Sequence, residues 1–91
     1  MRFFILRKER AIIKRIVNIY LKNKNFEQAR KIASSIKDSY EKDTVLFKIA
    51  MFCLKNNNIE EARRIVNEIH ESYYKVRILT NIAKILLHNL K

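Results

Sequence analysis

The chain has 91 residues, and its 20 lysines and arginines outnumber 9 aspartates and glutamates, for a formal net charge of +11. It has no glycine, no proline and one cysteine. Phosphate-cradling loops and tight β-hairpin turns normally use glycine where φ is positive, so Rossmann-type sites, P-loops and hairpin-rich β folds are disfavoured. With 48% hydrophobic residues the chain can still bury a core. The composition predicts one all-helical domain over residues 1–91.

Residues 1–9 are predicted to be a basic and apolar extension of the first helix. Their apolar run from Phe3 to Leu6 is too short for the hydrophobic region of a signal peptide, about 7 to 15 residues, or for a membrane span. The single Cys53 lies in an apolar stretch and cannot form an intramolecular disulfide. We therefore expect a cytoplasmic protein with no membrane association.

An internal repeat organises the rest of the chain. A shift of 33 positions aligns residues 10–42 with residues 43–75 without a gap, and 13 of the 33 pairs are identical. The identical pairs are Ile16/Ile49, Leu21/Leu54, Lys22/Lys55, Asn23/Asn56, Asn25/Asn58, Glu27/Glu60, Ala29/Ala62, Arg30/Arg63, Ile32/Ile65, Ile36/Ile69, Ser39/Ser72, Tyr40/Tyr73 and Lys42/Lys75. Residues 76–91 begin a third unit. A period in the low thirties is typical of stacked helical hairpins.

Each unit is predicted to hold two helices, because asparagine clusters and serines interrupt the apolar periodicity at regular places. Asparagine tolerates the left-handed conformation at a helix end, so the clusters around residues 22–25 and 56–58 predict tight turns. Turns this short make neighbouring helices antiparallel. The five expected helices span approximately residues 5–23, 26–38, 41–56, 59–71 and 74–90.

Six polar positions predict how these helices begin. Asn25 and Asn58 are expected to cap the second helix of each unit, and Gln28 and Glu61 to complete a capping box three residues later. Ser39 and Ser72 occupy the other junction, where a hydroxyl can cap the next helix.

The three units share a pattern of apolar, small and capping residues. In the second unit the pattern consists of Leu46, Ile49, Ala50, Cys53, Asn58, Ile59, Glu60, Glu61, Ala62, Val66 and Ile69. In the first it consists of Ile13, Ile16, Tyr20, Asn25, Phe26, Glu27, Gln28, Ala29, Ala33 and Ile36, and in the third of Leu79, Ile82, Ala83 and Leu86. With these residues the units resemble the tetratricopeptide repeat (TPR) over residues 10–91. The sequence departs from the family in its 33-residue period, in lacking glycine at the mid-repeat turn, and in Glu41 and Tyr74 where proline is frequent. The resemblance implies a right-handed stack of antiparallel helical hairpins, an α-solenoid.

In such a stack the first helix of each unit lines a concave groove. The predicted groove residues are Lys14, Asn18, Lys22, Phe47, Met51, Lys55, Arg77 and Lys84. This basic groove with an apolar floor suits an acidic protein or peptide segment. Lys14, Asn18 and Arg77 also match positions of the family's carboxylate clamp, whereas Lys48 and Asn81 depart from it.

Charge leaves a second function open. Residues 1–24 carry eight basic residues and one acidic residue. Such a stretch either binds nucleic acid in a salt-dependent, sequence-independent way or is simply a solvated helix face. Ordinary solvated faces mix both signs of charge, which argues against a merely solvated helix face.

The last helix suggests self-association. Its apolar residues cover too wide an arc for a capping helix, which should present a polar outer side. The candidate contact residues are Ile78, Ile85, Leu86 and Leu90. We expect a homodimer through this helix, unless Phe3 to Leu6 cover part of the stack or the apolar end stays partly exposed on a monomer.

No residues suggest catalysis or a bound cofactor or metal. His70 and His88 are eighteen residues apart on different predicted helices, without cysteines or paired carboxylates at ligand spacing. Cys53 is predicted to face inward, where a thiol is normally inert. We therefore expect a non-enzymatic protein.

Overall fold

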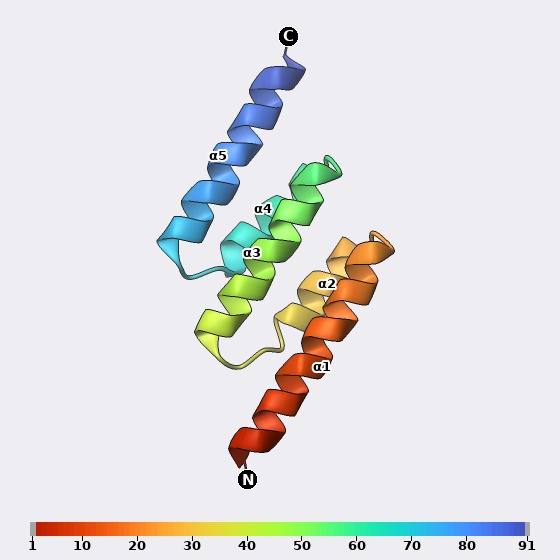
Figure 1. The fold of residues 1–91 in the computed structure, drawn as a ribbon. Coiled ribbons are helices and arrows are strands. Elements are labelled where there is room, and N and C mark those ends of the chain that lie inside the picture. The colour runs from red at the N-terminus through yellow and green to blue at the C-terminus, as the bar shows by residue number, and fades with distance from the viewer. Residues whose placement is uncertain (1, 91) are drawn as a thin grey trace.

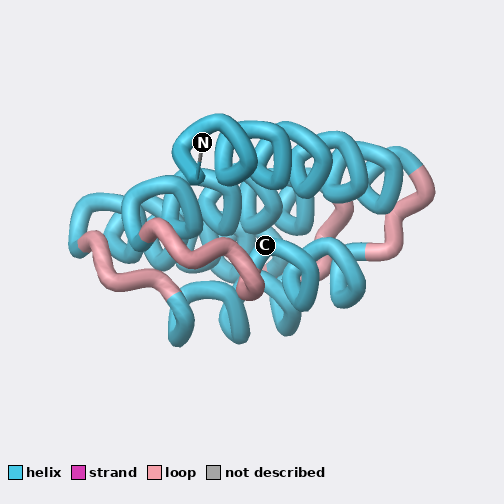
Figure 2. Tube along the Cα trace, turned by 90° about the horizontal axis from the view of Figure 1, so that it is seen from below, coloured by secondary structure: helices cyan, strands magenta, loops and turns pink. Residues whose placement is uncertain are grey.

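The structure is a computed structural model that describes the backbone of residues 2–90 and the side chains of residues 9–90. Within that range the chain is all-helical, with five helices and no strand, which confirms the predicted class and number of elements. The helices are α1 Arg2–Lys22, α2 Phe26–Ala33, α3 Ser39–Lys55, α4 Ile59–Glu68 and α5 Ser72–Asn89. Figure 2 shows short loops joining them. No helix in this range is long and apolar enough to cross a bilayer.

The helices form two rows. In Figure 1 α1, α3 and α5 run side by side, with α2 and α4 behind them. Contacts join α1 to α2 and α3 to α4, and also link α1 with α3, α3 with α5, and α2 with α4. Over the described residues α3 is the one helix that contacts all four others, while α1 and α2 do not reach α5. Long-range packing therefore depends on α3.

The turn between α1 and α2 depends on a left-handed residue. Lys24 has a φ of 59°, and its amide donates to the carbonyl of Leu21 at 3.0 Å. The amide of Asn25 donates to the carbonyl of Tyr20 at 2.8 Å, and together these bonds close a Schellman motif. The same geometry recurs between α3 and α4, where Asn57 also has a φ of 59°. Asparagine therefore replaces glycine at the second turn, as predicted, but lysine does so at the first.

The predicted caps are only partly correct. The Asn58 side chain accepts from the amide of Glu61 at 3.2 Å, as expected, but the Glu61 carboxylate bonds to arginines and does not close a capping box. Asn25 occupies the N-cap position of α2 without a side-chain cap bond. Ser39 and Ser72 were wrongly predicted to be caps, because each is the first residue of its helix.

The second helix of each unit is also shorter than predicted. Helix α2 ends at Ala33 and α4 at Glu68, several residues before the expected ends at 38 and 71. After each end the chain leaves the helix and buries an isoleucine, Ile36 at 4% exposure and Ile69 at 2%. Asp38 then caps α3 by accepting from the amides of Tyr40 and Glu41. Burial of the isoleucine thus prevails over local helix propensity.

Backbone geometry repeats at the interval of the sequence repeat. The N-cap angles are φ −89° and ψ 68° at Asn25, and φ −91° and ψ 74° at Asn58. At the other junction they are φ −72° and ψ 118° at Asp38, and φ −72° and ψ 116° at Glu71. Both pairs are 33 residues apart, so aligned positions of the two units share their local conformation.

The core follows the apolar positions of the repeat. Ala29 and its aligned partner Ala62 are both fully buried, which allows α2 and α4 to approach their neighbours closely. Ile49 and Cys53 of α3 are also fully buried, and the core extends to Ile82 of α5. One cluster of buried side chains therefore joins residues from all five helices.

Candidate binding surfaces

A cleft of about 230 Å³ lies between α1 and α3. Its lining residues are Lys14, Val17, Asn18, Thr44, Val45 and Lys48. The Lys48 ammonium donates to Oδ1 of Asn18 at 2.9 Å, and the Lys14 ammonium pairs with the Glu41 carboxylate. Lysines from two different helices therefore line a cleft whose floor holds two valines.

A second cluster lies where α3 meets α5. The Phe47 and Tyr74 rings stack with centroids 4.6 Å apart. The Arg77 guanidinium lies over two rings, 5.5 Å from the centroid of Phe47 and 5.7 Å from that of Tyr73. Cation–π contact of this kind holds the arginine against α3 while its charge stays at the surface.

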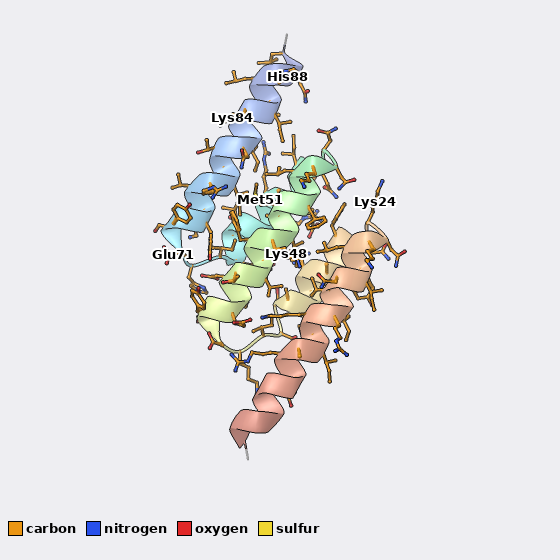
Figure 3. The ribbon with its side chains drawn as sticks, in the orientation of Figure 1. Lys24, Lys48, Met51, Glu71, Lys84 and His88 are labelled. Carbon is orange, nitrogen blue, oxygen red and sulfur yellow. The ribbon has the colours of Figure 1, made fainter. Side chains whose placement is uncertain are left out.

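The structure separates the predicted groove residues into these two groups. Lys14 and Asn18 line the α1/α3 cleft, whereas Phe47 and Arg77 belong to the α3/α5 cluster, where Asn81 also approaches the sulfur of Met51 at 3.8 Å. The other three predicted residues are exposed lysines, Lys22, Lys55 and Lys84. Figure 3 labels Lys48 and Met51 on α3 and Lys84 and His88 on α5.

Sequence reasoning missed Lys48 as a cleft residue and Glu41 as the acidic partner of Lys14. Lys48 was set aside because it departs from the clamp pattern, yet it shares an exposed face of α3 with Lys55, seven residues later. That spacing was the signal that could have identified it. Glu41 lies in the first turn of α3, and its ion pair with Lys14 joins α3 to α1. That contact depends on how the two helices pack, which the sequence pattern did not specify.

Charge is divided unequally between the two rows. Helices α1, α3 and α5 together carry 13 lysines and arginines and 3 acidic residues. Helices α2 and α4 together carry four of each. One of the three acids, Asp43, is buried and accepts from the backbone amides of His70 and Glu71. The row of α1, α3 and α5 is therefore strongly basic, and the row behind it is balanced.

The balanced row contains an ion-pair network that sequence reasoning missed. The Arg30 guanidinium of α2 donates to the Glu61 carboxylate and, at 2.8 Å, to that of Glu68, both on α4. Glu61 is 3% exposed, and Arg64 also donates to it at 3.2 Å. The hydrogen bond to Glu61 is the main cause that raises the pKa of Arg30. The network joins the second helices of the two units.

The residues predicted for self-association do not share one surface. Ile78 is fully buried in the core, so its assignment to an exposed contact was wrong. Ile85 is partly buried against the core. Leu86 and Leu90 are exposed, at 41% and 83%, together with Leu79 and Leu87. The exposed leucines of α5 thus include two predicted residues, Leu86 and Leu90, and two that the sequence analysis did not select, Leu79 and Leu87.

Cys53 and the histidines have ordinary surroundings. Cys53 is fully buried, as predicted, and desolvation raises the pKa of its thiol to about 12. His70 and His88 are exposed. Among the described side chains, no group of three histidines, cysteines or acids could hold a metal ion.

Some predictions fall on side chains outside the described range. They concern Arg2, Arg7 and Lys8 of the basic stretch and the apolar run from Phe3 to Leu6.

No family model matches the chain, and comparisons with curated proteins and with solved structures find no match either. Function is therefore inferred from the geometry and charge of the chain itself.

Proposed function

We propose that the chain is a TPR-like, right-handed stack of helical hairpins that acts as a non-catalytic interaction module for an acidic protein segment. Two observations support the stacking. Described helices contact only near neighbours in chain order, and the turn and cap angles recur after 33 residues. In a stack of this kind each hairpin buries its apolar face against the next, and one row of helices forms the ligand surface.

The observation that carries the proposal is the charge difference between the rows. A row of helices whose sequence carries 13 basic and 3 acidic residues, with one of the acids buried, attracts an acidic partner over a distance of about one Debye length, roughly 8 to 10 Å. The balanced row behind it has no such preference. The acidic segment therefore binds along α1, α3 and α5.

The α1/α3 cleft provides the specific contacts. A carboxylate placed there can replace the neutral Asn18 oxygen as the acceptor for Lys48, which converts an ammonium–amide hydrogen bond into an ion pair. The valines of the floor offer apolar contact beside it. On α5, Arg77 and Lys84 extend the basic surface for the rest of the segment.

Fluorescence anisotropy with a labelled acidic peptide tests this assignment. We expect Lys48→Glu to weaken binding by roughly tenfold or more, a loss of at least about 1.4 kcal/mol, because charge reversal brings like charges together at the cleft. Lys37→Glu, on the loop between α2 and α3, is the matched control and should change affinity by less than about threefold. Equal effects of the two variants would show that the cleft is not the site.

Nucleic acid is the second candidate, because the basic residues of α1 suit a phosphate backbone. A labelled duplex should be titrated in parallel at low and raised salt. Tight duplex binding with a steep salt dependence, together with no peptide binding, would reverse the assignment in favour of nucleic acid.

A further inference from the structure

The end of the molecule formed by α4 and α5 has an unfilled surface. A hollow of about 430 Å³ lies between the two helices. Its lining residues are Ile59, Glu60, Arg63, Arg64, Asn67 and Leu86. We call this hollow, together with the exposed Leu79 and Leu87 of α5, the end surface.

Aligned positions of α3 and α5 show what the end surface lacks. Leu46 is fully buried, but its partner 33 residues later, Leu79, is 50% exposed. The next aligned pair shows the same difference, because Leu54 is 6% exposed and Leu87 is 62% exposed. Helix α3 packs against α4 and three other helices, whereas α5 contacts only α3 and α4 over the described residues. The end surface therefore matches the place that α4 fills one unit earlier.

Charge shows the same relation. Arg30 of α2 donates to Glu61 and Glu68 of the next second helix, α4. Its aligned partner on α4 is Arg63, which is exposed and makes no ion pair with any described side chain. Neighbouring Arg64 is already paired with Glu60 and Glu61. Arg63 is thus placed to receive a carboxylate as Arg30 does.

We propose that the end surface binds an amphipathic α-helix of a partner protein, with a glutamate that pairs with Arg63. This rests on the stacked-hairpin organisation proposed above but not on the groove. The chemistry of the occupant follows from α4, which combines small and branched apolar residues, Ala62, Ile65 and Val66, with an inward glutamate. A second copy of this chain fits less well, since two copies facing each other would bring Arg63 and Arg64 against the same positive charges.

The chain supplies its own probe, a labelled peptide with the sequence of residues 58–71, which includes α4. Titrated against the full chain, it should bind the end surface, and Arg63→Glu should weaken that binding by roughly tenfold or more. A peptide with Glu61→Lys should be weakened similarly on the unchanged chain. The reversed pair, Arg63→Glu with the Glu61→Lys peptide, should recover most of the affinity, which a merely structural effect of either change would not produce.

Controls separate this site from other modes of binding. A peptide that displaced the chain's own α4 would place its glutamate against Arg30 instead of Arg63. The affinity of that peptide would therefore not respond to Arg63→Glu. Lys48→Glu, the groove variant, should leave peptide binding unchanged, so a failure of the groove is distinguishable from a failure here. Circular dichroism checks that Arg63→Glu and Leu86→Glu keep their helicity.

Three results would overturn the proposal. The first is no detectable binding of the peptide to the unchanged chain. The second is binding that neither Arg63→Glu nor Leu86→Glu reduces. The third is a dimer by light scattering that Leu86→Glu converts to a monomer, which would assign the surface to a second copy.

Discussion

Lys24 adopts a left-handed conformation that a residue with a β-carbon reaches only at a cost. Two backbone hydrogen bonds require that conformation, from the Lys24 amide to the Leu21 carbonyl and from the Asn25 amide to the Tyr20 carbonyl. The strain therefore persists in the fold. Lys24→Gly should therefore raise the free energy of unfolding by roughly 0.5 to 1 kcal/mol. Urea denaturation followed by circular dichroism measures the change.

A second lysine in the same helix end is the matched control. Lys22 is the last residue of α1, and Lys22→Gly removes the same charge from a helical position. This variant should lower stability by up to about 1 kcal/mol. If Lys24→Gly destabilised the protein as much as Lys22→Gly does, the left-handed turn would not carry the strain assigned to it.

At the scale of the elements, the ion-pair network fixes α4 against α2. Glu61 is almost completely buried, so removal of Arg30 leaves a carboxylate without its main partner. We expect a double-mutant cycle of Arg30→Ala and Glu61→Ala to give a coupling energy of about 1 to 3 kcal/mol. The exposed pair of Glu60 and Arg64, 3.5 Å apart, should give less than about 0.5 kcal/mol in the same cycle. Comparable values for both pairs would contradict a structural role for the buried pair.

The sequence predicted elements well where the determining interactions are local. Five helices, the Asn58 cap and the turn at Asn57 all follow from residues within a few positions of one another. The misses depend on distant partners. The Asp43 carboxylate accepts a hydrogen bond from the amide of His70, which is 27 residues away. Glu61 was interpreted locally as a capping-box residue, but it accepts a hydrogen bond from Arg30 on another helix.

The candidate site was predicted in the same uneven way. Periodicity placed basic residues on the first helix of each unit, and the charge difference between the rows agrees with that placement. It did not predict that Lys48 would reach Asn18 or that Arg77 would lie over Phe47, because both contacts depend on how closely α3 packs against its neighbours. The burial of Ile78 was missed for the same reason, since a wide apolar arc does not reveal which side meets the core.

At the scale of the whole molecule, stability depends on α3, the helix that contacts all the others. Ile49 is fully buried at its centre, and Ile49→Ala should cost about 2 to 5 kcal/mol. That loss is a large part of the total stability of a domain this small, so we expect the whole chain to unfold together at lower urea concentration. Ile12→Ala, on an α1 residue that is 54% exposed, is the matched control and should change stability far less.

Cys53 reports whether that unfolding is global. It lies one helical turn from Ile49, fully buried, and burial raises the pKa of its thiol to about 12. The thiolate is therefore scarce and inaccessible in the folded chain, and alkylation near pH 9 requires opening of α3. In Ile49→Ala we expect the urea midpoint of Cys53 alkylation to coincide with that of helix loss. Alkylation that preceded helix loss would instead mean that α3 separates from its neighbours while the remaining hairpins stay folded, which is incompatible with a core shared by all five helices.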